Sequence, residues 1–173
     1  ECSLDQIRLI HETVPQIPLE AFVHGALCVS YSGRCQASQF CFSRSANRGQ
    51  CAQFCRLPFS LVDAEGKVLA KEKYLLSLRD MNRTASLEKM MDAGIRSFKI
   101  EGRLKDVSYV KNVTAWYRRR IDEILRRRPE YGRASLGTVE LNFQPNPQRS
   151  FSRGFTEYFL HERTKMASFH TPK

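Results

Sequence analysis

The chain is organised around one cysteine-rich stretch, Glu20–Arg56, which reads EAFVHGALCVSYSGRCQASQFCFSRSANRGQCAQFCR. Five of the six cysteines lie in it, at positions 28, 35, 41, 51 and 55. Cysteines at this density indicate a disulfide framework, a metal or iron–sulfur site, or a redox thiol pair. Buried free cysteines that pack as small apolar residues are the remaining interpretation.

Three features of the stretch favour a metal. Cys51 and Cys55 are separated by three residues, so one turn of chain can bring both thiols to a single ion. Glycines near the cysteines let backbone amides approach the thiolate sulfurs and stabilise their charge. Arginines surround the thiols and favour the thiolate form that binds metal, at positions 34, 44, 48 and 56.

The same residues resemble a known family. The run E-x-F-x-x-G-A-L-C-x-x-x-x-G-x-C-x-x-S at 20–38 resembles the signature of the collagenase-like peptidase family U32. The segments RSANRGQCAQFCR, DMN, FKIEGR and RGFTEYFLH also resemble that family, so the resemblance covers nearly the whole chain. Relatives in anaerobic ubiquinone synthesis carry a 4Fe-4S cluster on four cysteines. The resemblance therefore implies a 4Fe-4S cluster, or alternatively zinc, on Cys28, Cys35, Cys51 and Cys55, with Cys41 outside the set.

The resemblance also implies a function. It points to an RNA-modifying enzyme that carries out iron–sulfur-dependent hydroxylation of a cytidine in large-subunit ribosomal RNA, with a hydroxyl source derived from prephenate. Ribosomal RNA or its precursor would be the partner, and neither a membrane nor DNA is expected. A collagenase-like U32 peptidase and a zinc-stapled RNA-binding module are the alternatives.

The net charge, the missing signal motifs and the ends of the chain limit which of these functions the sequence allows. The 28 Lys and Arg against 18 Asp and Glu give a formal net charge of +10, which favours nucleic acid as a partner, although a solvated basic surface gives the same balance. No run of about 18 apolar residues and no signal peptide is found, so we expect a cytoplasmic protein with reduced thiols. The chain begins and stops abruptly, and we expect it to be a fragment. The sequence holds no G-x-S-x-G or H-E-x-x-H motif, which argues against a serine or zinc peptidase.

The hydrophobic pattern predicts alternating helices and strands. We expect helices over 3–14, 84–92 and 106–128, a hairpin over 57–70, and strands over 19–23, 74–78, 95–100 and 137–143. This order favours an α/β fold, a partial TIM-like (β/α) barrel with a cysteine-rich insertion and a C-terminal extension, or else an open α/β sheet. Residues 1–128 would form the C-terminal part of the barrel, including the cluster region 20–56, and 129–173 a linker and the start of a β-containing extension.

Charged residues near the strand ends complete the predicted site. Alternation along 95–100 puts Lys99, Glu101 and Arg103 on one face, pointing inward in a barrel, either at a site or in a salt-bridged interior without catalytic use. These three and His24 are the candidate catalytic residues. His24 would orient the cluster ligands or, in a peptidase, act as base for a cysteine.

Binding residues are predicted from charge and resemblance. The candidates for substrate binding are Arg56, Asp80 and Arg44, and the link to prephenate makes Lys99, Arg103 and Arg56 candidates for its carboxylates. The arginine runs 118–120 and 126–128 predict a solvated helix face, with Asp122 and Glu123 paired to Arg126 and Arg127. The aromatic segment 151–160 must find a surface to bury against.

Overall fold

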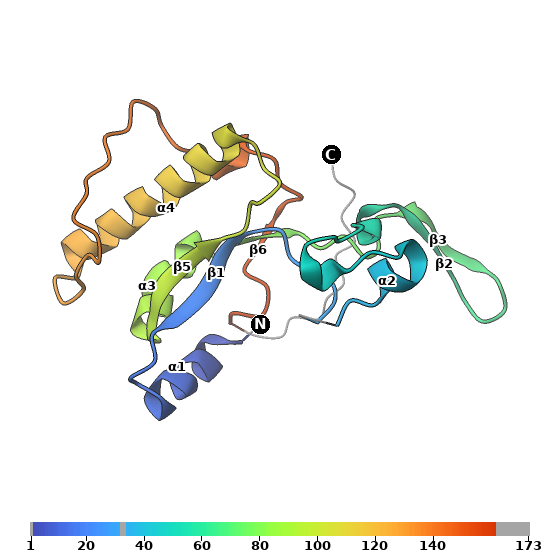
Figure 1. Cartoon of the computed structure of the whole chain (residues 1–173), viewed down its shortest axis with the longest axis horizontal. Helices are drawn as coiled ribbons and strands as arrows, with labels where there is room; N and C mark the ends of the chain where they lie inside the picture. The colour runs from blue at the N-terminus through green and yellow to red at the C-terminus, as the bar shows by residue number, and fades with distance from the viewer. Residues whose placement is uncertain (1, 32–33, 162–173) are drawn as a thin grey trace. The chain divides into compact units, whose positions relative to one another are not determined.

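A computed structural model of the chain describes residues 2–31 and 34–161 (Figure 1). These residues divide into two compact units, one formed by 2–25 with 80–161 and the other by 26–31 with 34–79. The end of the predicted C-terminal extension, 162–173, lies outside the described residues. Among the residues described, no helix is both long enough and apolar enough to cross a membrane.

The first unit is built on a four-stranded sheet with the order β5-β1-β4-β6. β1 (Leu19–Gly25) pairs in parallel with β5 (Ile95–Ile100) and antiparallel with β4 (Asp80–Asn82), and β4 pairs in parallel with β6 (Phe155–Thr156). The C-terminal ends of β1 and β5 therefore lie at the same edge of the sheet as the N-terminal ends of β4 and β6. The predicted α/β class is confirmed, and the strands present a mostly parallel sheet.

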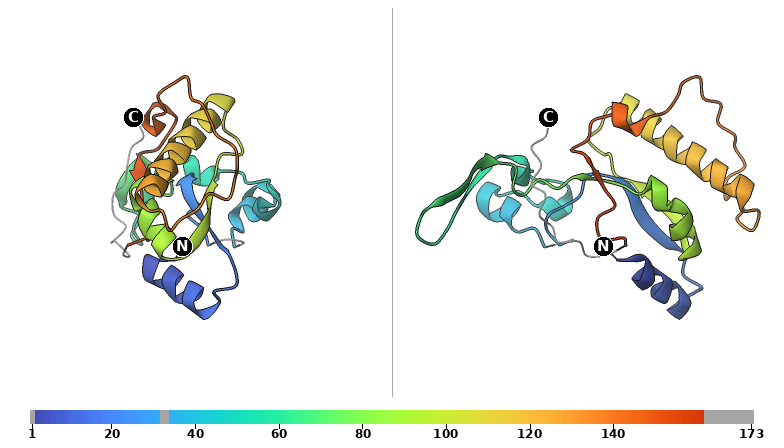
Figure 2. Two further views of the ribbon diagram at one scale, coloured as in Figure 1. Left: turned by 90° about the vertical axis from the view of Figure 1, so that its left-hand side faces the viewer. Right: turned by 180° about the vertical axis from the view of Figure 1, so that it is seen from behind.

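Three helices of this unit begin and end where the sequence predicts. α1 (Leu4–Thr13) starts at Ser3, whose hydroxyl accepts from the amide of Gln6 while the Gln6 side chain accepts from the amide of Ser3. α3 (Leu87–Asp92) follows the 3-10 turn η3 (Thr84–Ser86), and α4 (Val107–Arg127) starts at Asp106, whose carboxylate accepts from the Tyr109 amide at 2.7 Å. In Figures 1 and 2, α4 lies above the β1–β5 pair and α1 below it.

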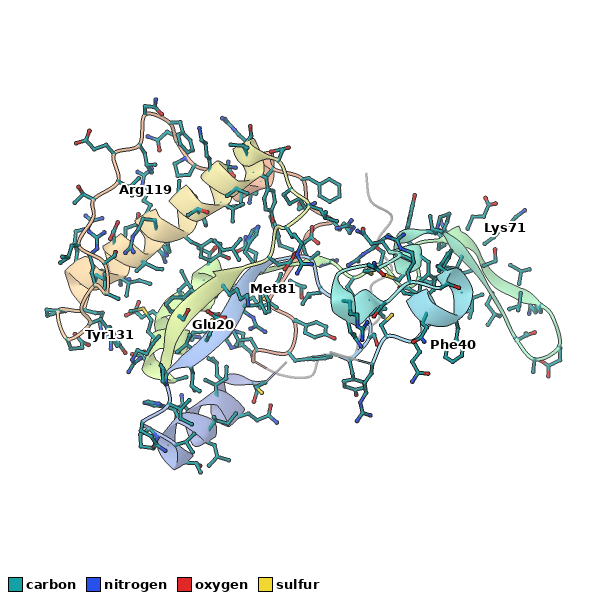
Figure 3. All side chains as sticks on the ribbon, in the orientation of Figure 1. Glu20, Phe40, Lys71, Met81, Arg119 and Tyr131 are labelled. Carbon is teal, nitrogen blue, oxygen red and sulfur yellow. The ribbon has the colours of Figure 1, made fainter. Side chains whose placement is uncertain are left out.

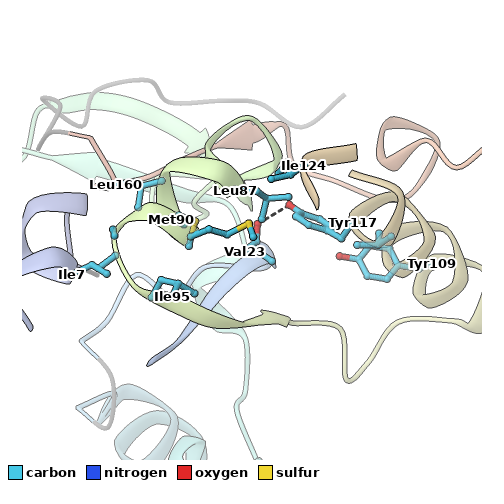
Figure 4. Close-up of a cluster of buried hydrophobic side chains, with 12 residues drawn as sticks. Ile7, Val23, Leu87, Met90, Ile95, Tyr109, Tyr117, Ile124 and Leu160 are labelled. Carbon is cyan, nitrogen blue, oxygen red and sulfur yellow. Dashed lines mark hydrogen bonds between the residues drawn. The ribbon is translucent and has the colours of Figure 1, made fainter. Parts of the chain in front are cut away.

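The apolar core of this unit lies between the strands and the helices (Figure 4). Its most deeply buried side chains come from β1, α3, α4 and the last described segment: Val23, Leu87, Met90, Val113, Ile124 and Leu160. The predicted aromatic segment thus buries its end here, with the Leu4 amide donating to the Leu160 carbonyl at 2.8 Å. Its first residue, Phe151, is still 58% exposed.

Two predicted strands and one set of ion pairs are wrong. Residues 74–78 form turns, with the Ser77 amide bonded to the Tyr74 carbonyl, because local hydrogen bonds replace a ladder. Residues 137–143 alternate like a strand but have no strand partner among the described residues. On α4, Asp122 and Glu123 pair backward, with Arg118 at 2.7 Å and Arg120 at 2.9 Å. Arg127 and Arg128 reach α3 instead, where both bind Glu88.

The second unit carries the cysteines and the predicted hairpin. Its elements are α2 (Ala37–Phe42), the 3-10 turns η1 (Ala46–Arg48) and η2 (Phe54–Arg56), and the strands β2 (Phe59–Val62) and β3 (Val68–Lys73). β2 and β3 pair antiparallel around Gly66, whose φ of +83° suits the turn. The short η4 (Pro147–Arg149) belongs to the first unit.

Candidate functional site

One arginine ties together the two ends of the cysteine-rich segment. The guanidinium of Arg56 donates to the Leu27 carbonyl, to the Ser77 hydroxyl at 3.2 Å and to the Leu78 carbonyl at 3.3 Å. Leu27 precedes Cys28 and Arg56 follows Cys55, so these bonds hold the segments of the first and last predicted ligands to one another. The three acceptors are neutral and do not cancel the charge of Arg56.

A buried serine ties the middle of the same segment. Ser38, on α2, is fully buried, and its hydroxyl accepts from the Ala52 amide at 3.1 Å. Because Ser38 lies three residues after Cys35 and Ala52 follows Cys51, this bond joins the segments of the other two predicted ligands. The local fold of the second unit therefore links all four predicted ligand positions through two polar side chains.

The pKa of the Cys55 thiol reflects the groups that surround it. Burial raises the pKa of the Cys55 thiol, the Arg56 charge opposes this effect, and the thiols of Cys51, Cys28 and Cys35 raise the pKa further. These three are the other members of the predicted ligand set, whereas Cys41 is an exposed residue of α2. Four thiols are the donor set that both zinc and iron–sulfur clusters take, so the residues fit the group chemically.

The arrangement of the predicted ligands does not by itself define a metal site. Within 2–31 and 34–161, no three His, Cys, Asp or Glu side chains are gathered closely enough to hold one metal ion. An electrostatic effect between thiols acts over several ångströms, while a metal–sulfur bond is about 2.3 Å long. The ligand set thus stays a prediction.

The second group of candidate residues lies at one edge of the sheet in the first unit. His24, near the end of β1, is only 2% exposed, and its ring lies 5.5 Å from those of Tyr117 and Phe155 and 6.1 Å from that of Tyr109. The Tyr117 hydroxyl lies 3.3 Å from His24 Nδ1 and donates to the Val23 carbonyl at 2.8 Å (Figure 4). Since a hydroxyl has one proton, this arrangement assigns the Nδ1–H tautomer to His24.

Burial sets the protonation of the histidine and the two tyrosines at this edge of the sheet. Desolvation lowers the pKa of His24 to about 4, although the negative charge of Asp80 acts in the opposite direction. Burial likewise raises the pKa of Tyr109 and of Tyr117 to about 12. The imidazole is therefore neutral at pH 7, and both phenols keep their protons.

Asp80 is held in place by an arginine that the sequence reasoning missed. The Asp80 carboxylate is 4% exposed, accepts from the Arg153 amide at 3.0 Å and pairs with the Arg153 guanidinium at 3.2 Å. The pairing follows from the sheet, because β6 aligns Phe155 with Asp80 and so brings the residues before it alongside. The RGFTEYFLH segment contains Arg153, but nothing in its pattern identifies the partner.

Glu101 is brought to the same edge by close backbone packing. Its amide donates to the His24 carbonyl at 2.8 Å, and a Cβ on Gly25 would lie 2.3 Å from the Glu101 carbonyl oxygen. Gly25 also has a φ of +112°, a conformation that other residues rarely adopt. The structure thus brings His24, Asp80 and Glu101 to the same edge of the sheet.

The other charged candidates make different contacts, and the Arg103 amide donates to the Glu101 carboxylate at 3.5 Å. Lys99 alternates with the half-buried Phe98 along β5, and its ammonium pairs at 3.4 Å with Glu20 of β1. Figure 3 labels Glu20 on the ribbon. Arg103 and Arg44 are exposed. The predicted roles of these residues, and their convergence with the cysteines on one site, stay predictions.

Tyr109 and Tyr117 are further site residues that the sequence reasoning missed. Both fall on the apolar stripe of α4, where they read as core residues. Their hydroxyl groups are the available signal, because a buried tyrosine hydroxyl needs a hydrogen-bond partner. Tyr117 finds partners in the Val23 carbonyl and the Asn82 side chain, at 2.8 and 3.1 Å.

Comparison with known proteins defines the class. Residues 1–169 match the profile of peptidase family U32, and the chain belongs to this family. The predicted family resemblance is thereby confirmed. No solved structure matches the chain.

The relatives compared below include RNA hydroxylation proteins and a collagenase. The chain is 51% identical over its whole length to the 23S rRNA 5-hydroxycytidine C2501 synthase of Escherichia coli, of which it spans 26%. It is 41% identical, over 70% of its length, to a tRNA hydroxylation protein of Bacillus subtilis, of which it spans 30%. It is also 34% identical, over 94% of its length, to a collagenase of Porphyromonas gingivalis, of which it spans 41%. The chain therefore covers less than half of the length of each of these relatives.

Proposed function

We propose that the chain is part of an RNA-modifying enzyme that hydroxylates a cytidine of large-subunit ribosomal RNA. The observation that carries this proposal is the 51% identity, over the entire chain, to a 23S rRNA 5-hydroxycytidine synthase. The net charge of +10 supports it, since a basic protein gains affinity for RNA phosphates through the release of counterions. Action on ribosomal RNA would place the protein in the cytoplasm.

We propose further that Cys28, Cys35, Cys51 and Cys55 hold a 4Fe-4S cluster. Such a cluster supplies one-electron redox chemistry when bound. Arg56 and Ser38 would keep the four ligand segments in place through their bonds to the backbone. The chemistry of the donor set supports this assignment, and zinc is the alternative metal.

The charged residues then take separate roles. His24, neutral at pH 7, would orient groups at the sheet edge through Tyr117 rather than carry charge. Arg103 and Arg56 would bind the carboxylates of a hydroxyl donor derived from prephenate, because a guanidinium can donate two parallel hydrogen bonds to a carboxylate. Arg44 would add positive charge near the cluster, and Lys99, with Glu20, would line the barrel interior.

The partial barrel is part of the same proposal. One face of β1 and β5 packs on the core, while the other bears Glu20, Phe22, Ser97 and Lys99 and is open, with Phe22 43% exposed. An exposed aromatic ring on a parallel strand pair is unusual, because parallel sheets are normally covered on both faces. Closing the sheet into a (β/α) barrel would put this face inside.

A peptidase is the second candidate, because a relative at 34% identity is named a collagenase. A cysteine peptidase needs a histidine that takes a proton from the thiol. His24 fits this role poorly, since aromatic rings enclose it and its pKa is lowered to about 4. Hydroxylation is therefore the function that we favour.

The proposal is tested in cells that lack the gene and carry a plasmid copy of the full-length protein. We expect Cys51→Ala to abolish 5-hydroxycytidine in 23S ribosomal RNA, measured by mass spectrometry, and Cys41→Ala to leave it at the wild-type level. Cys41 is the matched control because it is an exposed cysteine of the same segment. Unchanged modification with the Cys51 variant would contradict the proposal.

A further inference from the structure

A pocket in the first unit lies beside the His24 cluster. It has a volume of about 870 Å³ and is lined by residues that include Asn82, Thr84, Trp116, Arg119, Gln144 and Phe155. Phe155 also contacts His24, at a ring distance of 5.5 Å, so the pocket reaches the sheet edge that carries the candidate residues. The volume falls in the range of small-molecule sites, roughly 300–1,000 Å³. We call it the Trp116 pocket.

Three side-chain oxygens that line the Trp116 pocket already accept hydrogen bonds within the protein, those of Asn82, Thr84 and Gln144. Asn82 Oδ1 accepts from the Thr84 amide at 3.1 Å and from the Thr84 hydroxyl at 2.6 Å, and it lies 3.1 Å from the Tyr117 hydroxyl. Gln144 Oε1 accepts from Arg119 at 2.6 Å, and the Thr84 hydroxyl accepts from the Trp116 indole N–H at 3.0 Å. These bonds fix the orientation of both side-chain amides.

Two carboxylates that line the pocket are engaged as well. Glu123 pairs with Arg120 at 2.9 Å, and Glu157 accepts from the Ser86 hydroxyl at 2.5 Å and lies 3.1 Å from the His161 ring nitrogen. The donors that a ligand meets are the side-chain amide groups of Asn82 and Gln144 and the guanidinium of Arg119, and they share the pocket wall with Glu123 and Glu157. Arg119 keeps its positive charge, since its partner Gln144 is neutral.

The shape and the donors together select a class of ligand. The ring of Trp116 is fixed by its bond to Thr84 and offers a flat surface for stacking, while Arg119 suits a phosphate. A ligand with a planar ring, carbonyl acceptors and a negative charge satisfies Trp116, the two side-chain amides and Arg119. We propose that the Trp116 pocket binds a pyrimidine nucleotide of RNA, with the base against Trp116 and the phosphate at Arg119.

This site deepens the proposed function and rests on it for the identity of the RNA. Enzymes that act on a base in structured nucleic acid must take the nucleotide out of its stack and hold it in a pocket. The Trp116 pocket is suited to this task because it lies next to His24 and Tyr117. Asn82, in the wall of the pocket, lies 3.1 Å from the Tyr117 hydroxyl, and that hydroxyl lies 3.3 Å from His24 Nδ1.

The test uses the full-length protein with cytidine 5′-monophosphate, and with ribose 5-phosphate as the ligand that lacks a base. Binding is measured by calorimetry. We expect cytidine 5′-monophosphate to bind about tenfold or more tightly than ribose 5-phosphate, since stacking on an aromatic side chain has an effect of this order. Quenching of the Trp116 fluorescence, identified by difference from the Trp116→Phe variant, should accompany binding.

Four variants separate contact with the ligand from folding. Arg119→Gln should weaken the binding of cytidine 5′-monophosphate about tenfold, because a charged hydrogen bond is lost. Arg126→Gln, which removes an exposed arginine of the same helix that does not line this pocket, should leave binding unchanged. Trp116→Phe should keep most of the affinity, whereas Trp116→Leu should lose the preference for the nucleotide over ribose 5-phosphate.

Three results would overturn the inference. They are equal binding of both ligands, wild-type affinity in Arg119→Gln, and no binding at all, which would mean that another part of the protein fills the pocket. Failure of the pocket and failure of the proposed function are distinguishable. If Cys51→Ala abolishes 5-hydroxycytidine while Arg119→Gln and Trp116→Leu both bind and modify like the wild type, only the pocket is wrong. If the nucleotide binds as described but cells without the gene keep 5-hydroxycytidine, only the function is wrong.

Discussion

At the scale of single residues, His24 couples folding to pH. Its pKa falls from 6.5 to about 4 on folding because burial disfavours the charged ring. Between these values the unfolded chain binds a proton that the folded protein does not. The free energy of unfolding should therefore fall as the pH drops from about 6.5 to about 4, by up to about 3 kcal/mol from this residue.

This pH dependence is measured by urea unfolding of the wild type and of His24→Gln between pH 7 and pH 4. We expect the difference in stability between the two proteins to shrink as the pH falls, because only the wild type carries the histidine contribution. A difference that stays constant over this range would show that His24 is not a buried neutral base.

Gly25 gives a second prediction for a single residue. In Gly25→Ala the new Cβ would meet the Glu101 carbonyl at 2.3 Å, and the backbone already has a φ of +112°. We expect a loss of stability of about 2–4 kcal/mol from clash and strain together. Gly66→Ala is the control, since Gly66 has a φ of +83° but no atom within 4 Å of the added Cβ.

The Gly66 variant should lose about 1 kcal/mol of stability, since only the cost of the positive φ for alanine applies there. Both variants are compared with the wild type by chemical denaturation. Equal losses at the two positions would mean that the close approach of Gly25 to Glu101 does not exist in solution.

At the scale of elements, much of the fold follows from local signals in the sequence. The capping box at Ser3, the Asp106 cap and the Gly94 stop, with its φ of +102°, define helices that the sequence predicts to within three residues. The strands 74–78 and 137–143 were predicted wrongly, because alternation shows only that a segment could pair, while pairing needs a neighbouring strand. β6, only two residues long, carries too short a pattern to detect.

The candidate site was only partly predictable for the same reason. The positions of His24 and Glu101 follow from the ends of the strands predicted over 19–23 and 95–100, whereas Asp80 was placed after a strand over 74–78 that does not form and instead begins β4. Arg153, Tyr109 and Tyr117 reach that edge through tertiary contacts that no local pattern records. The engaged acceptors of the Trp116 pocket are likewise visible only once segments distant in the sequence lie together.

Ser38 allows a prediction about the cysteine segment as an element. Ser38→Ala removes the acceptor of the Ala52 amide and should loosen the tie between α2 and the Cys51 segment by about 1 kcal/mol. We expect the purified protein to lose its metal about fivefold faster under a chelator, followed by absorbance. Ser45→Ala is the control, because Ser45 accepts through its backbone carbonyl. Identical rates for both variants would remove Ser38 from the support of the site.

At the scale of the whole molecule, the two kinds of relative predict different activities. A closed centre with four thiolates leaves no open position for hydrolysis, and His24 is too deeply buried to activate a thiol. We therefore expect the full-length protein not to cleave gelatin. Cleavage that disappears in Cys28→Ala or His24→Gln, with 5-hydroxycytidine unchanged, would favour the peptidase.

The central claim is that four particular cysteines bind an iron–sulfur cluster, and metal analysis of anaerobically purified full-length protein tests it most directly. The wild type should show the broad absorbance of a 4Fe-4S cluster toward the blue end of the visible spectrum, with matching iron and sulfide. Single alanine variants at Cys28, Cys35, Cys51 and Cys55 should each lose it, while Cys2→Ala and Cys41→Ala should keep it. A colourless wild-type protein that contains zinc, or a cluster that needs Cys41, would contradict the account.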